Sequence, residues 1–117
     1  MKKAVFYFLL FTLFSSCQND DVPKGLSDCV KVKIDQLKSE SSQNPPAKIW
    51  QYQYRGQTVY YLPPTCCDQM GELYDENCNL ICYPDGGITG RGDGKCEDFF
   101  SARQNEILVW EDKRLLE

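Results

Sequence analysis

The sequence predicts a small α+β domain in which an N-terminal helix packs on an antiparallel sheet built around a β-hairpin, with disulfides as stabilising crosslinks. Three observations predict this fold class. Apolar residues recur at helical spacing after Ser27, two aromatic-rich runs flank Arg55-Gly56, and the 117-residue chain contains seven cysteines. A chain of this size buries a modest core, so covalent crosslinks are expected to supply part of its stability.

The first element is a helix expected over residues 28–40. Ser27 is a suitable N-cap and Asp28 places a negative charge in the first turn. The apolar positions at helical spacing are Leu26, Val30, Ile34 and Leu37. Val30, Val32 and Ile34 also alternate as in a strand, which is the alternative, but the length of the segment favours a helix. Residues 41–46 end it and form a loop.

Residues 49–54 and 57–62 are expected to pair as a β-hairpin through a two-residue turn at Arg55-Gly56. This register places Tyr54 opposite Gln57, Tyr52 opposite Val59 and Trp50 opposite Tyr61. These pairs give the hairpin one aromatic face, which we expect to pack on the helix. The other face carries Ile49, Gln51, Gln53, Tyr60 and Leu62.

Shorter elements follow the hairpin. Residues 73–75 and 80–82 are predicted strands about a turn at Glu76-Asn77, and residues 83–87 form a further turn. Residues 97–103 are expected to form a short helix, and residues 107–110 a final buried strand.

The N-terminus has the layout of a secretory signal peptide, with Lys2 and Lys3 before an apolar run over residues 4–14. This run is too short for a permanent membrane-spanning helix. The sequence Phe14-Ser15-Ser16-Cys17 resembles a lipobox, in which the cysteine is acylated and becomes the new N-terminus. We therefore expect Cys17 to be lipidated.

This processing predicts three segments. Residues 1–16 are the lipoprotein signal peptide, residues 17–27 the lipidated cysteine and a flexible tether, and residues 28–117 a single small cysteine-rich domain. The tether begins with Gln18-Asn19-Asp20-Asp21, which looks like the acidic signal that directs Bacteroidota-type lipoproteins to the cell surface. The expected location is the bacterial outer membrane, lipid-anchored, with surface exposure as one option.

The remaining cysteines are expected to form three disulfides, because their number is even and an exported protein meets an oxidising compartment. They are Cys29, Cys66, Cys67, Cys78, Cys82 and Cys96. The sequence does not choose among their pairings. Cys66 and Cys67 are expected to bond to different partners, because a ring closed by neighbouring cysteines has unfavourable geometry.

Composition argues against several functions. The chain has no histidine, which excludes Ser-His-Asp and Cys-His catalysis and every His-ligated zinc site. Its net charge of −4 gives no reason to bind nucleic acid. The absence of a Cys-x-x-Cys spacing disfavours both a zinc knuckle and a redox enzyme. We expect no catalytic residues, no metal, no cofactor and no enzymatic activity.

Residues 84–96 form the most distinctive segment, with five glycines in nine residues. A phosphate cradle is disfavoured because Lys95 is followed by Cys96 and not by Ser or Thr. An irregular calcium loop using Asp85, Asp93, Glu97 or Asp98 is a second option. Arg91-Gly92-Asp93 matches the tripeptide of integrin ligands, but a structural glycine turn is the preferred interpretation.

Four motifs together resemble a family of small Bacteroidota lipoproteins of unknown function. They are Ile49-x-x-Tyr52-x-Tyr54-x-Gly56-x-x-Val59-Tyr60-Tyr61, Cys66-Cys67-Asp68, Leu73-Tyr74-Asp75 and the glycine-aspartate segment from Pro84 to Gly94. The resemblance spans roughly residues 29–112 and implies a lipidated cell-envelope domain without assigned activity. The family pattern often has glycine where Cys78 stands, which leaves two disulfides and two other thiols as an alternative.

The sequence thus predicts a non-catalytic binding domain, held at the membrane by its lipid anchor, for an unknown protein or carbohydrate partner. The expected contact residues are Trp50, Tyr52, Tyr54, Tyr60, Tyr61, Arg91 and Asp93. One alternative is a protease inhibitor that presents residues 85–95 in an extended, rigid form. The other is a thiol-disulfide enzyme that uses Cys66 or Cys67.

Overall fold

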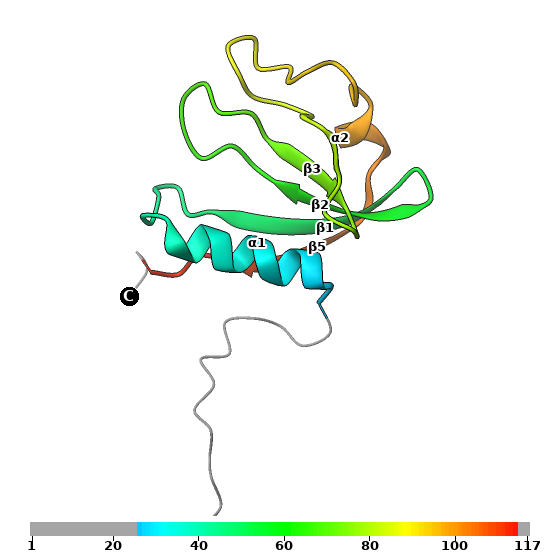
Figure 1. The fold of residues 1–117 in the computed structure, drawn as a ribbon. Coiled ribbons are helices and arrows are strands. Elements are labelled where there is room, and N and C mark those ends of the chain that lie inside the picture. The colour runs from blue at the N-terminus through cyan, green and yellow to red at the C-terminus, as the bar shows by residue number, and fades with distance from the viewer. Residues whose placement is uncertain (1–25, 115–117) are drawn as a thin grey trace, which may run out of the picture.

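The computed structural model describes residues 26–114 of the chain (Figure 1). The predictions of a signal peptide over residues 1–16 and of lipidation at Cys17 lie outside the described residues, as does most of the predicted tether. Within residues 26–114, no helix is long and apolar enough to span a membrane.

The described chain is an α+β domain, as the sequence predicts. Its elements are α1 (Asp28–Ser39), β1 (Lys48–Tyr54), β2 (Gln57–Leu62), β3 (Glu72–Asp75), β4 (Leu80–Cys82), α2 (Phe99–Ala102) and β5 (Gln104–Glu111). The five strands form one sheet in the order β4-β3-β2-β1-β5, and all neighbours are antiparallel. Figure 1 shows α1 across one face of this sheet.

The predicted helix is confirmed and ends one residue earlier than expected. The backbone N–H of Val30 donates to the Ser27 side chain at 3.4 Å, so Ser27 caps the helix as predicted. Val30 and Ile34 face the sheet and are buried against Ile49 and Trp110. The strand alternative for this segment is therefore wrong.

The hairpin of β1 and β2 has the predicted turn and register. Arg55 and Gly56 have φ of 50° and 76°, the left-handed conformations that a tight two-residue hairpin turn requires. Trp50 pairs with Tyr61, and Tyr52 pairs with Val59. A two-residue turn of this kind matches the right-handed twist of the two strands. The dipeptide Arg55-Gly56 between two alternating runs therefore predicts the hairpin well.

The aromatic face of the hairpin does not pack on α1, contrary to the prediction. It packs instead on Phe99 of α2, whose ring centroid lies 5.5 Å from that of Tyr52, 5.3 Å from Tyr54 and 5.4 Å from Tyr61. The sheet is covered on both faces, and α1 takes the opposite face with Ile49 and Tyr60. The edge-to-face contacts of Tyr52 and Tyr54 with Phe99 favour this assignment of faces.

The two short strands β3 and β4 flank a turn, as predicted. The Asp75 carboxylate fixes that turn by accepting hydrogen bonds from the backbone N–H groups of Asn77 and Asn79, both at 2.9 Å. These hydrogen bonds lower the pKa of Asp75, because they favour its charged form.

The final strand β5 forms one edge of the sheet, and only its second half is buried. Val109 and Trp110 belong to the core beneath α1, but Ile107 is 51% exposed and Leu108 is 43% exposed. The prediction of a buried strand is therefore wrong for these two residues. An edge strand has a neighbour on one side only, and the pairing of β5 with β1 is interrupted by register shifts.

Three disulfides are present, as predicted, but one pairing differs from expectation. Cys29 pairs with Cys78, and Cys82 pairs with Cys96. Cys66 and Cys67 pair with each other. The expectation of different partners is wrong because the other four cysteines pair among themselves, and Cys82 and Cys96 do so inside the core. The alternative with two disulfides and two other thiols is excluded as well.

Asp112 and Arg114 fix the end of β5 to the end of α1. Arg114 Nε and Nη2 donate to the Asp112 carboxylate at 3.0 and 2.7 Å. Arg114 Nη1 also donates to the carbonyl oxygens of Lys38 and Glu40 at 3.2 and 3.0 Å, and Nη2 donates to that of Leu37 at 3.3 Å. The arginine therefore satisfies carbonyl groups at the end of α1, and it adds a second hydrogen bond to the Leu37 carbonyl, which also accepts from the Glu40 N–H.

We expect Asp112→Asn to lower stability at neutral pH and to weaken its dependence on acid. Hydrogen bonds from Arg114 hold the pKa of the buried Asp112 carboxyl below its ordinary value of 3.8. A lowered pKa in the folded state gives a stabilisation that is present above the unfolded pKa and lost as pH falls through the folded pKa. In urea unfolding, the variant should be less stable by about 1 to 3 kcal/mol at pH 7. This difference should shrink towards pH 2, and a constant difference would contradict a contribution from the charge.

Candidate functional site

The candidate site is the loop of residues 83–96, which connects β4 to α2 and lies at the top of Figure 1. The Cys82–Cys96 disulfide closes its base, and both cysteines are buried beside Phe99. The loop therefore starts and ends at fixed points of the core. We call residues 83–96 the glycine loop.

Backbone hydrogen bonds hold the glycine loop in one folded form. Within it, Gly92 N–H donates to the Gly86 carbonyl and Asp93 N–H to the Tyr83 carbonyl, both at 3.0 Å, and Gly86 N–H donates to the Gly90 carbonyl at 3.2 Å. Gly86 and Gly92 have φ of 78° and 65°, a conformation that favours glycine. The expectation of a structural glycine turn is confirmed.

A second set of hydrogen bonds ties the glycine loop to the segment between β2 and β3. Gly87 N–H donates to the Gln69 carbonyl at 3.2 Å, and Gly71 N–H donates to the Asp85 carbonyl at 3.1 Å. The Tyr61 hydroxyl also donates to Asp85 Oδ2 at 2.7 Å. Burial raises the pKa of Tyr61, and its hydrogen bond to Asp85 raises it further, so this tyrosine stays a neutral donor.

The tip of the glycine loop exposes an apolar residue. Ile88 is 91% exposed, and the turn that carries it is closed by a hydrogen bond from Gly90 N–H to the Gly87 carbonyl at 3.3 Å. Arg91 and Asp93 are exposed on the same loop. An isoleucine held at the tip of a rigid loop loses little conformational freedom when a partner covers it.

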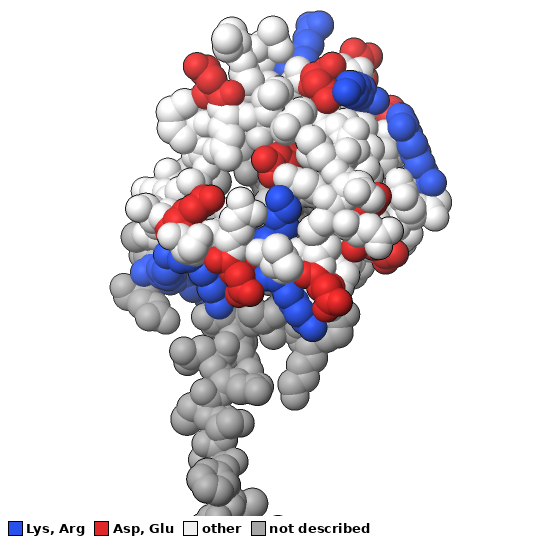
Figure 2. Space-filling view, viewed as in Figure 1, with Lys and Arg blue, Asp and Glu red and all other residues white. Residues whose placement is uncertain are grey.

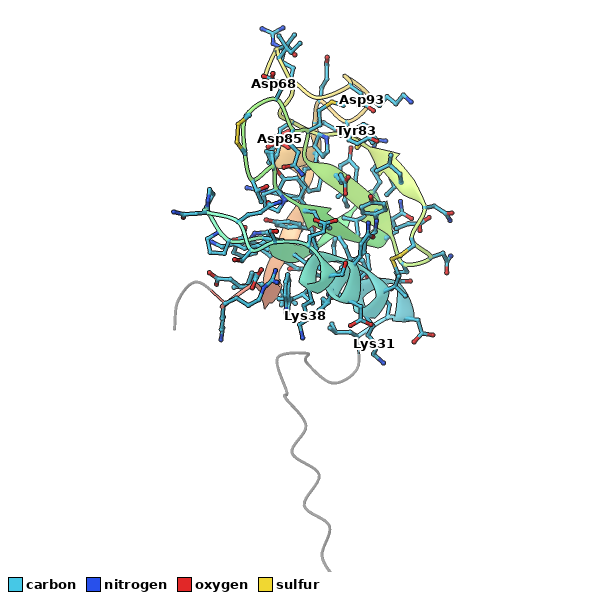
Figure 3. All side chains as sticks on the ribbon, turned by 60° about the vertical axis from the view of Figure 1, so that its left-hand side comes forward. Lys31, Lys38, Asp68, Tyr83, Asp85 and Asp93 are labelled. Carbon is cyan, nitrogen blue, oxygen red and sulfur yellow. A yellow bond between two sulfur atoms is a disulfide. The ribbon has the colours of Figure 1, made fainter. Side chains whose placement is uncertain are left out.

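The glycine loop and α1 occupy opposite ends of the molecule. Figure 3 places Asp68, Tyr83, Asp85 and Asp93 together at one end, and it places Lys31 and Lys38 of α1 at the other. Residue 26, the first that the structure describes, precedes α1 directly. The chain thus enters the domain far from the loop.

The predicted aromatic contact surface does not exist as such. Tyr52, Tyr54, Tyr60 and Tyr61 are buried, and Trp50 is half-buried against the core around Phe99. Their rings build the two cores because both sheet faces are covered. Of the predicted contact residues, Arg91 and Asp93 are the two that are exposed.

The hydroxyl groups of Tyr52 and Tyr74 hydrogen-bond to carboxylates. The Tyr52 hydroxyl donates to Glu106 at 2.6 Å, and the Tyr74 hydroxyl donates to Glu72 at 2.8 Å. Burial raises the pKa of Tyr52 to about 12, with its hydrogen bond to Glu106 as a further cause. These tyrosines stabilise the fold through a buried ring and a satisfied hydroxyl.

The acidic residues proposed for calcium do not converge. Asp85 accepts a hydrogen bond from Tyr61, Asp93 accepts one from the Lys95 backbone, and Asp98 pairs with Arg55. Among residues 26–114, no three His, Cys, Asp or Glu side chains gather in an arrangement that could hold a metal ion. The calcium-loop option is not supported by this geometry.

The inhibitor alternative predicted an extended loop, and the structure shows a tightly turned one. The loop is rigid, as that alternative requires, but residues 86–92 fold back on themselves.

Cys66 and Cys67, the residues of the thiol alternative, are both exposed in the segment between β2 and β3.

Sequence reasoning missed Ile88. A signal was available, because Ile88 is the lone large apolar residue within residues 85–95, a segment of glycine, charged and polar residues. Such a residue has no periodic partner that would bury it, which favours an exposed position.

The fold and the loop together define a class: a small disulfide-crosslinked α+β domain that displays a rigid glycine-rich loop. A family model matches residues 35–112, and the chain belongs to that family, described as "Domain of unknown function (DUF6970)". The match contains the whole sheet and the glycine loop. No curated protein matches the chain, and no solved structure does.

Proposed function

We propose that the protein is a lipid-anchored, non-catalytic binding domain of the bacterial cell envelope that contacts a protein partner through the tip of the glycine loop. The observation that carries the proposal is the 91% exposure of Ile88 on a loop fixed by hydrogen bonds and a disulfide. Full burial of an isoleucine contributes about 1.5 to 3 kcal/mol to an interface. Arg91 and Asp93 beside it supply charges for a polar rim.

The arrangement of the domain supports anchored display. A lipid on Cys17 would connect to the α1 end of the domain through residues 18–27, and the glycine loop lies at the opposite end (Figure 3). The loop would then face away from the membrane, which is the side where a partner approaches. The lipobox-like sequence and the acidic residues after Cys17 support the outer membrane as the location.

Site-specific photo-crosslinking in the native membrane tests the contact. A photoreactive amino acid at position 88 should give a discrete crosslinked protein, and the same label at position 32 should not. Val32 is a matched control because it is 61% exposed on α1, away from the loop. Adducts at both positions, or at neither, would overturn the loop as the contact site.

The anchor is tested on the same cells. Fractionation should find the wild-type protein in the membrane and Cys17→Ser in the soluble fraction, with the acyl mass absent from the variant. Membrane retention of an unacylated Cys17→Ser protein would overturn lipid anchoring and leave the crosslinking result standing by itself.

A further inference from the structure

A groove of about 210 Å³ lies on the sheet face that carries α1. One wall is α1, the other is the segment after β2, and the floor is formed by side chains of β2 and β3. The lining residues that matter here are Lys33, Leu37, Leu62, Met70, Glu72 and Tyr74. Figure 2 shows the surface hollowed above α1, with acidic and basic side chains around the hollow.

An ammonium group and a carboxylate share one aromatic ring in this groove. Lys33 Nζ lies 4.1 Å from the centroid of the Tyr74 ring, and the Tyr74 hydroxyl donates to Glu72 Oε2 at 2.8 Å. Tyr74 is buried in β3, so both charged groups contact a ring that the core holds in place.

Both charged groups keep unused hydrogen-bonding capacity. Within residues 26–114, the ion pairs are Arg55 with Asp98 and Arg114 with Asp112, so Lys33 and Glu72 pair neither with each other nor elsewhere. Among the hydrogen bonds formed within residues 26–114, none has the Lys33 ammonium as donor and none has Glu72 Oε1 as acceptor. Lys33 and Glu72 therefore offer a cationic donor and an anionic acceptor on either side of Tyr74. Lys48 and Glu40 also line the groove, so its charged lining is balanced between the two signs.

Apolar side chains lie beside these charges. Leu62 pairs with Glu72 across β2 and β3, so the two side chains lie side by side on the same face. Leu37 from α1 and Met70 from the opposite wall complete an apolar part of the groove.

We propose that this groove binds a small zwitterion with an apolar side chain, namely a free amino acid of the leucine type. Its carboxylate would accept hydrogen bonds from Lys33, its ammonium would donate to Glu72, and its side chain would lie against Leu62 and Met70. Hydrogen bonds between two charged groups are the strong kind. The volume is below the 300–1,000 Å³ or so of pockets for drug-sized molecules, which suits a ligand of amino-acid size.

The charge pattern disfavours other small ligands. A simple anion would be attracted by Lys33 but repelled by the nearby Glu72 carboxylate. A simple cation would be attracted by Glu72 but repelled by Lys33. A neutral sugar would satisfy both groups without the gain of opposite charge. A zwitterion is the class that matches both groups at once.

Calorimetric titration of the detergent-purified protein with L-leucine tests the proposal. We expect saturable binding that weakens at least tenfold for N-acetyl-L-leucine, which lacks the ammonium, and for L-leucinamide, which lacks the carboxylate. No saturable binding of L-leucine would overturn the proposal. Equal binding of either analogue, or of glucose, would overturn it too.

Variants locate the site. Lys33→Gln and Glu72→Gln should each weaken L-leucine binding at least tenfold, while the exposed matched controls Lys31→Gln and Glu76→Gln should leave it unchanged. Equal losses in the controls would place the site elsewhere and overturn the assignment. If a groove variant fails to fold, the analogue series on the unmodified protein still decides. The groove does not depend on the proposed loop contact, so Ile88→Asp should bind L-leucine normally.

Discussion

Gly92→Ala should lower the free energy of unfolding by roughly 3 kcal/mol, a large fraction of the stability of a small domain. Gly92 lies where the glycine loop passes the backbone of Tyr83. An added Cβ would overlap the Tyr83 carbonyl oxygen, lie 2.7 Å from its carbonyl carbon and lie 2.8 Å from the Asp85 nitrogen. All three atoms belong to the backbone, so no side-chain rotation relieves the overlap.

Two effects add up in this substitution. A left-handed conformation, with φ of 65° at Gly92, destabilises an alanine by about 1 to 2 kcal/mol. Forcing an extra methyl group into packed atoms adds about 1 to 3 kcal/mol. The displaced backbone would also lose the hydrogen bond between Asp93 N–H and the Tyr83 carbonyl.

Gly90→Ala is the control that separates these effects. Gly90 has φ of 76°, but an added Cβ there would meet nothing within 4 Å. This variant should lose only the conformational part, about 1 to 2 kcal/mol. Urea unfolding followed by the fluorescence of Trp50 and Trp110 measures both variants. Equal losses would show that the contact with Tyr83 does not hold the loop.

The elements that the sequence predicts well are those specified by neighbouring residues. The hairpin depends on alternation and on a turn that Arg55-Gly56 can form, and α1 depends on Ser27 and a short apolar repeat. Each signal lies within one continuous stretch of the chain, residues 27–37 for α1 and residues 49–62 for the hairpin. The assignment of sheet faces is different. Either α1 or Phe99 could cover the aromatic face, and these two partners lie about 70 positions apart in the sequence. No local pattern contains that information.

The same distinction applies to the sites. The glycine loop is visible in the sequence because its composition is unusual, and Ile88 stands out within it. The groove is not visible, because Lys33, Glu72 and Tyr74 come from two elements that are joined only by the fold. The pairing of Cys66 with Cys67 could not be predicted either, since it follows from the pairing of four distant cysteines.

Removal of the Cys29–Cys78 disulfide by a double Cys→Ala substitution should lower the free energy of unfolding by about 4 kcal/mol. The crosslink spans 49 positions and connects the start of α1 to the turn between β3 and β4. Without it the unfolded chain gains the freedom of a loop of that length, which corresponds to about 4 kcal/mol in the chain-entropy estimate. The Cys82–Cys96 crosslink spans 14 positions, and the same estimate gives about 3 kcal/mol.

The Cys66–Cys67 disulfide is a control, because it is the same kind of bond but closes no chain segment between its two cysteines. The two residues are adjacent and exposed, so their double substitution frees no chain segment and empties no part of the core. Their loss should change the free energy of unfolding by less than about 0.5 kcal/mol, as for an ordinary surface substitution. Urea unfolding of the three double variants under one set of conditions gives the ranking. A large loss from Cys66 and Cys67 together would mean that these residues stabilise the segment after β2, and with it the loop whose backbone they support through Gln69.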